Sequence, residues 1–238
     1  NLANARELFE SQLEQVFTGD AVAEGWKEST LAEVLEVLRN GLSCKQNKSG
    51  LGHKISRIET VALGAFNMNR VGFAELSPQE AEKHRLQLGD ILFSHINSVP
   101  HVGKTAIFNE DAEIYHGMNL LLMRPVPGVD PYFLNHYLNS LFKGGYWRTR
   151  CKKSVNQASV NQKDIKRVPM PLPPLPEQKR IVEALDEACA NSAMLARIGE
   201  QKLAHLADLK QSLLHKAFTG ELTTDSKAAD RSLSEAGA

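Results

Sequence analysis

Basic residues are gathered in two short stretches of this chain, although its 28 basic and 28 acidic residues balance overall. Between Arg39 and Arg57, the first basic island, five basic residues accompany no acid, which gives +5. Between Lys143 and Arg167, the second basic island, eight basic residues accompany one acid, which gives +7. The rest of the chain therefore sums to −12. Two basic islands in an otherwise acidic protein are typical of a surface that binds a polyanion, although two solvated loops remain the alternative.

Nucleic acid is the polyanion that these residue types suit, because Lys and Arg bind phosphates while Arg, Asn and Gln read base edges. The residues expected to bind phosphate are Lys45, Lys48, Lys54, Lys143, Arg148, Arg150, Lys152 and Lys153. The residues expected to read bases, in or beside predicted loops, are Arg70, Asn97, His101, Asn156 and Gln157. For each base reader, a role in a turn or a structural hydrogen bond is the competing interpretation.

Motifs for catalysis are not recognisable in the sequence. Val102-Gly103-Lys104-Thr105 mimics the end of a phosphate-binding loop, but Ser98 stands where the first glycine is required. The eight histidines form no HExxH motif and no close Cys/His set, so no metal is expected. No dinucleotide-binding, nucleophile-elbow or methyltransferase motif is found either. We expect a non-catalytic chain without a cofactor; an enzyme with an unfamiliar site is an alternative class.

The elements that would position these residues are short and mixed. Residues 1–17 have the apolar spacing of an amphipathic helix that ends at Thr18-Gly19-Asp20. A capping box at Ser77-Pro78-Gln79-Glu80 begins another helix. Further helices are predicted at 31–38 and 131–141, and strands at 55–63, 90–96, 104–109 and 114–124, the last two joined by a turn at 109–111. The block from Trp26 to about Pro174 is therefore predicted to be one α+β domain.

Alternating prolines at 169–176 predict an extended, stiff strap without ladder donors, followed by a helix from Pro176 to about Phe218. About 40 residues at 1.5 Å each give a rod of about 60 Å. Gly199 and Lys202 interrupt its apolar stripe, so a local bend is expected there. A long helix with one apolar stripe needs a second helix along its length. The expected helix-interface residues are Leu8, Leu13, Ile181, Leu185, Leu195, Ile198, Leu206, Leu209 and Leu213.

An internal repeat relates the two ends of the chain. Leu8–Asp20 matches Leu209–Glu221 at a constant offset of 201, with identical Leu, Ser, Leu, Phe, Thr and Gly and a final acid. Six identities in register, on the apolar face as well as at the cap, indicate a unit of domain plus helix that is designed to occur twice. Two such units are expected to be related by rotation, within one chain or between chains.

The sequence resembles the specificity (S) subunit of type I restriction-modification enzymes, over nearly the whole of Leu8 to Glu221. The stretches that carry the resemblance are Gly89–Ser94 (Gly-Asp-Ile-Leu-Phe-Ser), Val160–Ile165 (Val-Asn-Gln-Lys-Asp-Ile), Pro171–Val182, and Leu209–Leu222 with Phe218-Thr219-Gly220-Glu221. The proline strap that runs into Glu177-Gln178-Lys179-Arg180-Ile181-Val182 is the most specific of them. The Gly-Asp-Ile-Leu block is weaker alone.

The resemblance implies a subunit with two target-recognition domains and two long antiparallel helices, in which each domain reads half of a bipartite DNA site. Such a subunit docks methyltransferase (M) subunits and, in the restricting complex, restriction (R) subunits. This chain departs from that pattern because it has one recognition domain, so it resembles a half-length form or the C-terminal half of a full subunit. Alone, it is expected to form a homodimer through its long helix and to read an interrupted palindrome.

The expected organisation is a conserved helix at 1–19, a DNA target-recognition domain at 20–175, a long helix for spacing, dimerisation and partner docking at 176–218, and a flexible tail at 219–238. Three scattered cysteines and the absence of a run of about 18 apolar residues predict a cytoplasmic protein without a membrane span. The main alternative function is a helical assembly or adaptor protein that does not read DNA sequence.

Overall fold

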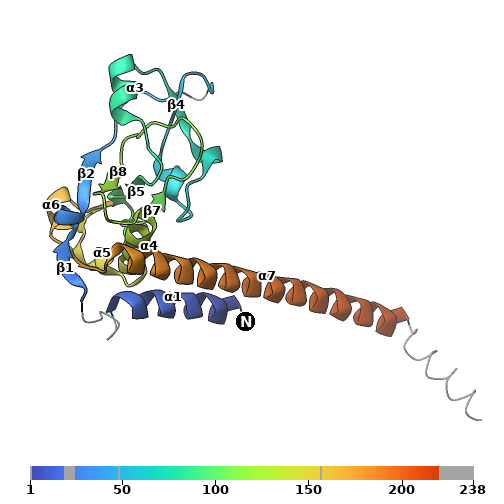
Figure 1. The fold of residues 1–238 in the computed structure, drawn as a ribbon. Coiled ribbons are helices and arrows are strands. Elements are labelled where there is room, and N and C mark those ends of the chain that lie inside the picture. The colour runs from blue at the N-terminus through green and yellow to red at the C-terminus, as the bar shows by residue number, and fades with distance from the viewer. Residues whose placement is uncertain (1, 19–24, 48, 156, 220–238) are drawn as a thin grey trace, which may run out of the picture. The chain divides into compact units, whose positions relative to one another are not determined.

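The computed structural model describes residues 2–18, 25–47, 49–155 and 157–219. The chain divides into a larger unit, Glu10–Glu187, and a smaller unit that joins Asn1–Phe9 with Ala188–Ala238. Strands and helices are mixed along the larger unit, whereas the smaller unit is helical where it is described (Figure 1). The fold is therefore α+β, as predicted. The expected tail at 219–238 lies outside the described residues, except Thr219.

A four-stranded antiparallel sheet lies at the centre of the larger unit. Its strands, in spatial order, are β2 (Leu35–Asn40), β8 (Leu121–Pro125), β5 (Ile91–Phe93) and β7 (Thr105–Ile107). Leu92 and Leu122, which face each other in register on neighbouring strands, pack with Phe108 in one buried apolar cluster. Helix α4 (Pro131–Lys143) packs beside β7 and buries Phe133 and Tyr137.

Three smaller sheets and several short helices surround this core. The sheets are β1 (Lys27–Thr30) with β11 (Pro169–Leu172), β3 (His53–Ile55) with β4 (Gly72–Ala74), and β6 (Ile96–Asn97) with β10 (Gln157–Ser159) and β9 (Lys152–Ser154). The helices are α2 (Leu31–Val34), η1 (Ile58–Val61), η2 (Met68–Arg70), α3 (Pro78–His84), α5 (Tyr146–Arg150) and α6 (Gln162–Lys166). Helix α3 begins at the predicted capping box: Ser77 Oγ accepts from the Glu80 N–H.

Two of the predicted elements are wrong in type. The helix expected at 31–38 ends at Val34, and the chain continues as β2, which pairs with β8. The strand expected at 55–63 reaches only Ile55, because the chain then turns into the 3₁₀ helix η1. In η1 the Thr60 hydroxyl donates to the Arg70 carbonyl and accepts from the Arg57 N–H, so side-chain bonds replace a ladder there.

The expected pairing of the strands at 104–109 and 114–124 is also wrong. The observed strands β7 and β8 are both in the central sheet, but β5 lies between them. Residues before β8 form isolated bridges instead, as at Tyr115, which bridges Ile55 and Arg85. A turn signal at 109–111 correctly marks the end of one strand without telling which strand pairs with which.

The proline strap is a strand rather than an isolated extended segment. Residues Pro169–Leu172 form β11, whose Met170 pairs with Ser29 of β1 and is buried. A strand turns only alternate N–H groups toward one neighbour. Prolines at alternate positions can therefore leave the N–H groups on one side of the strand free to bond with a neighbouring strand. The prediction of a strap without hydrogen-bond donors overlooked this. The Tyr137 hydroxyl of α4 also donates to the Pro169 carbonyl.

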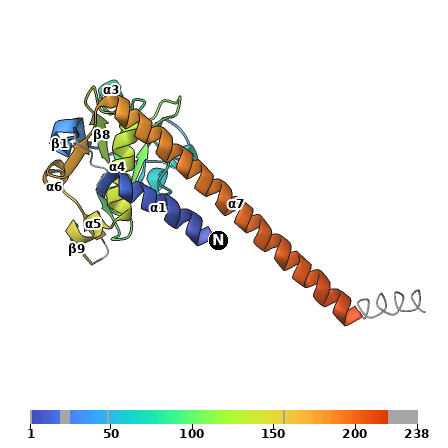
Figure 2. The same cartoon turned by 60° about the horizontal axis from the view of Figure 1, so that its bottom comes forward.

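Two long helices complete the fold. Helix α1 (Leu2–Thr18) is where the periodicity predicts it, and α7 runs without interruption for 45 residues, Leu175–Thr219 (Figure 2). The helix continues through Gly199, so the loosening expected there is not found in the secondary structure. Within the described residues, none of the helices has the length and hydrophobicity that a membrane crossing needs.

A buried ion pair explains the Gly89–Ser94 motif. The Arg124 guanidinium donates to both carboxylate oxygens of Asp90, at 2.7 and 2.8 Å, and Asp90 also accepts from the Gln87 N–H. Asp90 is fully buried, and its hydrogen bonds raise the pKa of Arg124 further above its usual value. Gly89 precedes it with φ +88°, a conformation that favours glycine.

Gln178 explains part of the motif that follows the prolines. Its side-chain oxygen accepts from the Asp130 N–H at 2.7 Å, and its nitrogen donates to the carbonyls of Pro173 and Gly128. Ile181 and Leu185, on the same helix face, are buried as well. The first turns of α7 are therefore held on the start of α4 by a fully buried amide and two apolar side chains.

Candidate nucleic-acid interface

The small sheet β6–β10–β9 brings together residues that are far apart in sequence. Asn97 of β6 lies opposite Ala158 of β10, and Ala158 lies opposite Lys153 of β9. Gln157 pairs with Ser154 at the turn end of the β9–β10 hairpin. Ala158 is fully buried and Val160 nearly so, which anchors the sheet to the domain. Two expected phosphate ligands and two expected base readers thus share one sheet.

Helix α5 leads directly into this sheet and carries two exposed arginines, Arg148 and Arg150. Its Trp147 is buried against Gly103, where an added Cβ would lie 2.1 Å from the indole ring. The Arg150 guanidinium stacks 3.9 Å from the centre of the Tyr146 ring. Because Trp147 fixes α5 under the turn that contains Gly103, the arginines are held beside the loop that follows β6.

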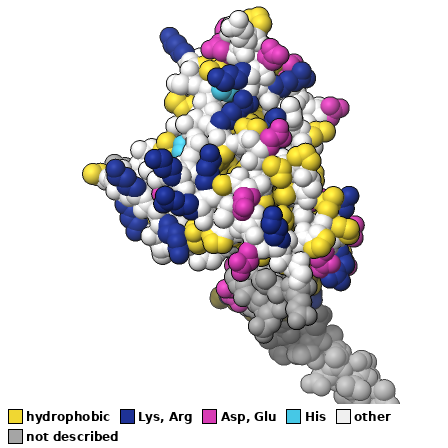
Figure 3. All heavy atoms as spheres, turned by 60° about the vertical axis from the view of Figure 1, so that its left-hand side comes forward, with side chains coloured by type: hydrophobic (Ala, Val, Ile, Leu, Met, Phe, Trp, Pro, Cys, Tyr) yellow, Lys and Arg dark blue, Asp and Glu magenta, His cyan; other side chains and the backbone are white. Residues whose placement is uncertain are grey.

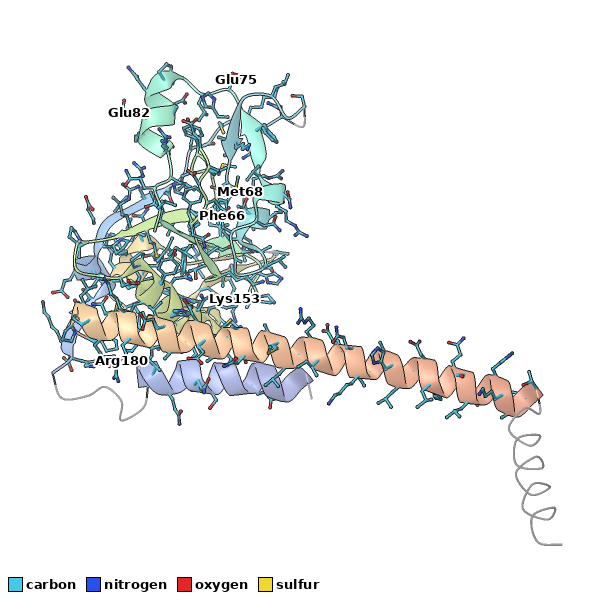
Figure 4. The ribbon with its side chains drawn as sticks, turned by 45° about the vertical axis from the view of Figure 1, so that its right-hand side comes forward. Phe66, Met68, Glu75, Glu82, Lys153 and Arg180 are labelled. Carbon is cyan, nitrogen blue, oxygen red and sulfur yellow. The ribbon has the colours of Figure 1, made fainter. Side chains whose placement is uncertain are left out.

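Cations dominate this part of the surface. Arg148, Arg150, Lys152 and Lys153 are all exposed, and no acidic residue occurs from Lys143 to Lys163. Figure 3 shows Lys and Arg side chains gathered on one face, with few acidic side chains among them. Lys153 lies well away from Glu75 and Glu82 of the larger unit (Figure 4). Such a patch creates a positive potential that attracts a polyanion.

Lys143 differs from the other members of the second basic island. It ends α4, and its ammonium group lies 3.2 Å from the Glu10 carboxylate of α1. Its side chain also lines a small hollow with Leu13 and Ser140. The structure therefore assigns Lys143 a contact with α1, and we leave it out of the proposed phosphate ligands.

The first basic island is placed on a different part of the larger unit. Lys45 and Lys54 are exposed, and Lys54 lies in β3 opposite Phe73 of β4. Arg39 donates to the Lys83 carbonyl and so belongs partly to the fold. Lys48 lies outside the described residues. The structure does not bring Lys54 onto the sheet that carries Lys153.

The expected base readers are not equivalent in the structure. Gln157 is exposed in β10, and His101 is exposed in the turn after β6. Asn97 is already engaged: its amide donates to Ser94 Oγ and accepts from the Ser98 N–H. Arg70 is exposed at the end of η2, on another element, and Asn156 lies outside the described residues.

The expected helix-interface residues fall into two groups. Leu13, Ile181 and Leu185 are buried within the larger unit, where Phe17 of α1 also meets the Phe133 ring at 5.4 Å. The other described members are exposed on α7: Leu195, Ile198, Leu206, Leu209 and Leu213. The Leu8 side chain is outside what the structure describes. The expected interface residues that remain exposed therefore all lie on α7 from Leu195 onward.

Among the described residues, no group of three or more His, Cys, Asp or Glu side chains is arranged to hold a metal ion.

Residues 23–201 match the family model described as the type I restriction modification DNA specificity domain. This match covers most of the chain. The chain belongs to this family.

Curated members of the type I specificity family are similar over most of this chain. It is 39% identical over 201 residues to the putative MjaX specificity subunit of Methanocaldococcus jannaschii, covering 83% of this chain and 46% of that protein. It is 32% identical over 206 residues to the EcoKI specificity subunit of Escherichia coli K12, covering 85% and 44%. The chain thus spans about half the length of the curated relatives it matches.

A solved structure agrees with the sequence comparison. The HsdS subunit of Thermoanaerobacter tengcongensis superposes with a TM-score of 0.62 at 27% identity, over 91% of this chain and 51% of that one. The type I specificity fold is therefore present here.

Sequence reasoning missed the hairpin that shapes this interface. Strands β9 and β10 have three residues each and are largely polar, so neither shows the apolar alternation that predicts a strand. It also read Lys104 only as part of a failed phosphate-binding loop. In the structure its ammonium group donates to the Ala62 carbonyl and ties η1 to β7.

Proposed function

We propose that this chain is the DNA-recognition part of a type I restriction-modification complex. It reads one half of a bipartite site and docks a methyltransferase subunit, and it contributes no catalytic residue of its own. The observation that carries the proposal is the convergence of Arg148, Arg150, Lys152 and Lys153 with Gln157 around one small sheet, in a member of the DNA specificity family. Phosphate contacts supply affinity there and base contacts supply specificity.

Assembly belongs to the distal part of α7. Leu206, Leu209 and Leu213 are about half exposed or more, although they follow the three-and-four spacing of a packed helix face. The repeat points the same way: Phe17 is buried in the larger unit, whereas Phe218, its counterpart at the offset of 201, is 89% exposed. A homodimer through α7 would cover this face and present two identical readers to an interrupted palindrome.

The exposed face of α7 also supports the second candidate, a helical adaptor that does not read DNA. The two functions differ in how DNA binding responds to salt. A protein that neutralises phosphates releases counterions, so the logarithm of its affinity falls with the logarithm of salt by about 0.9 per phosphate contact.

A salt series on the purified chain tests the proposal. Lys152→Ala and Arg148→Ala should each reduce the slope by about 0.9. Lys179→Ala, at an exposed position on α7, should leave the slope unchanged. Absence of salt-dependent binding to duplex DNA would favour the adaptor. Methylation or cleavage of DNA by the chain without a partner would contradict the non-catalytic role.

A further inference from the structure

The β9–β10 hairpin is a narrow ribbon at the edge of its sheet. Its last pair is Ser154 with Gln157, closed by a hydrogen bond from the Ser154 hydroxyl to the Gln157 carbonyl at 3.1 Å. The sheet order places β9 outermost, with β10 between it and β6. Of the described residues in 152–159, only Ala158 is buried. The two strands therefore join the domain through β6, and Ser154, Val155 and Gln157 beside the turn are exposed.

The charges of the ribbon lie on both of its faces. Successive residues of a strand point to opposite sides, so Lys152 and Lys153 point away from each other. Both are exposed, and Arg148 and Arg150 precede them in α5. A flat polyanion would contact the basic residues on only one face of the ribbon. A groove with phosphates along both of its walls would contact the basic residues on both faces.

The major groove of duplex DNA has the size for such a ribbon. Paired strands lie about 4.8 Å apart. The groove is about 12 Å wide and admits a two-stranded ribbon with its side chains. The minor groove of undeformed DNA is only about 6 Å wide, and ribbons that use it bend or widen the duplex.

The tip offers one apolar and one amide side chain to the floor of a groove. Val155 is 98% exposed, and Gln157 is exposed on β10 two positions later. In the major groove, thymine presents its C5-methyl group, which takes apolar contacts, and adenine presents N6 and N7, which pair with a Gln amide. Both features belong to A·T pairs. A single exposed valine is common on protein surfaces and would indicate nothing by itself. The inference depends on its position, because Val155 directly follows the strand that carries Lys152 and Lys153.

We propose that the β9–β10 ribbon enters the major groove, where Val155 contacts a thymine methyl group and Gln157 pairs with an adenine. Lys152 and Lys153 contact phosphates on the two walls of the groove. This inference rests on the proposed DNA recognition and names the element that performs it. The competing explanation is that the lysines only keep an exposed edge strand from pairing with other chains.

The test uses the full chain and chemically altered DNA. The unaltered chain first selects its preferred sequence from a pool of duplexes with randomised positions. Each thymine of that sequence is then replaced in turn by uracil, which lacks the methyl group, and each adenine by 7-deazaadenine, which lacks N7. Affinities are measured for the unaltered chain, Val155→Ser, Gln157→Ala and the control Leu88→Ser, at another highly exposed apolar residue.

One uracil position should weaken the unaltered chain about fourfold, the loss of a buried methyl group, and should leave Val155→Ser unaffected. One 7-deazaadenine position should weaken the unaltered chain about 5-fold or more and leave Gln157→Ala unaffected. Leu88→Ser should respond like the unaltered chain. If both variants still lose affinity at every altered base as the unaltered chain does, the ribbon does not read these bases, and the proposed function stands. If the unaltered chain selects no sequence, the proposed function fails and this inference with it.

Discussion

Asp90 and Arg124 form a two-bond ion pair whose carboxylate has no access to solvent, so each charge depends on the other. Arg124→Met keeps much of the side-chain volume but leaves the Asp90 carboxylate buried without its partner. We expect the free energy of unfolding to fall by about 3–5 kcal/mol, as measured by urea denaturation. Arg57→Ala removes an exposed ion pair with Glu59 and should cost less than about 1 kcal/mol. Equal effects of the two changes would refute this assignment.

His116 makes stability depend on pH. Burial lowers the pKa of His116 to about 3, and burial also lowers the pKa of His84 and of His95. The unfolded chain takes up the His116 proton near pH 6.5 and the folded chain only near pH 3, so the contribution of His116 to stability is full above pH 6.5 and is lost as the pH falls toward 3. Between pH 6.5 and 4.5, where carboxylates still keep their charge in the unfolded chain, His116 should contribute a slope of about 1.4 kcal/mol per pH unit. His84 and His95 should add to the slope in the same direction.

The check is denaturant unfolding of the unaltered chain and His116→Gln at several pH values in this window. His116→Gln should flatten the profile whatever its effect on the absolute stability, and His84 and His95 should leave a residual slope. An unchanged slope in the variant would show that His116 takes up its proton in the folded state.

Individual residues could be predicted from sequence where a local rule decides their role. Ser77 and Glu80 form the expected capping box at the start of α3. The contacts that Lys143 and Asn97 make within the chain were not predicted this way. Glu10, the partner of Lys143, is visible only once the fold has placed α4 beside α1, whereas Ser94, the partner of Asn97, lies only three residues away and was overlooked.

At the scale of elements, the Gln178 side chain joins the first turn of α7 to Asp130 at the start of α4, to Gly128 in the turn before it, and to Pro173 just ahead of α7. Gln178→Leu would leave the part-buried Asp130 N–H and the carbonyl of the buried Pro173 without these partners. A buried group that loses its partner costs about 1–3 kcal/mol, and we expect thermal unfolding at a clearly lower temperature. Lys179→Ala, at the next and exposed position, is the matched control. A variant as stable as the control would mean that water replaces the amide.

The long helices were predictable and most short elements were not, for a physical reason. Helix α7 repeats its pattern over 45 residues, so periodicity leaves little ambiguity. The stretch 31–38 has Leu31, Val34 and Leu38 at helical spacing, but its second half is a strand because β8 supplies a ladder. Short apolar runs fit both periods, and the partner strand, which is distant in sequence, decides.

At the scale of the whole molecule, the distal face of α7 is expected to bring two copies together. Leu209→Glu removes an apolar side chain from this face twice in a symmetric dimer. With about 1.5 kcal/mol for each buried leucine, dissociation should become easier by roughly 150-fold, as measured by sedimentation equilibrium. Gln211→Glu makes the same change in charge at an exposed position two residues further on and should have little effect. A chain that is monomeric at micromolar concentration before any change would rule out this homodimer.

The two basic islands show where whole-molecule prediction from sequence ends. Charge counting identified both, but only the second shares one sheet with expected base readers, as Lys153 does with Gln157. Lys54 lies in β3, on a different sheet. Charge along a sequence does not tell which segments share a face, because that depends on strand pairings between distant residues.

The shallow anchoring of the β9–β10 hairpin has a consequence for how such proteins diversify. Ala158 alone among its described residues enters the interior, so the exposed side chains at 152–155 and 157 can be exchanged without repacking the domain. A lineage could acquire a new DNA target by exchanging a few base pairs of its gene while the scaffold is inherited unchanged. An engineer could graft a hairpin from one member onto another at the same two junctions.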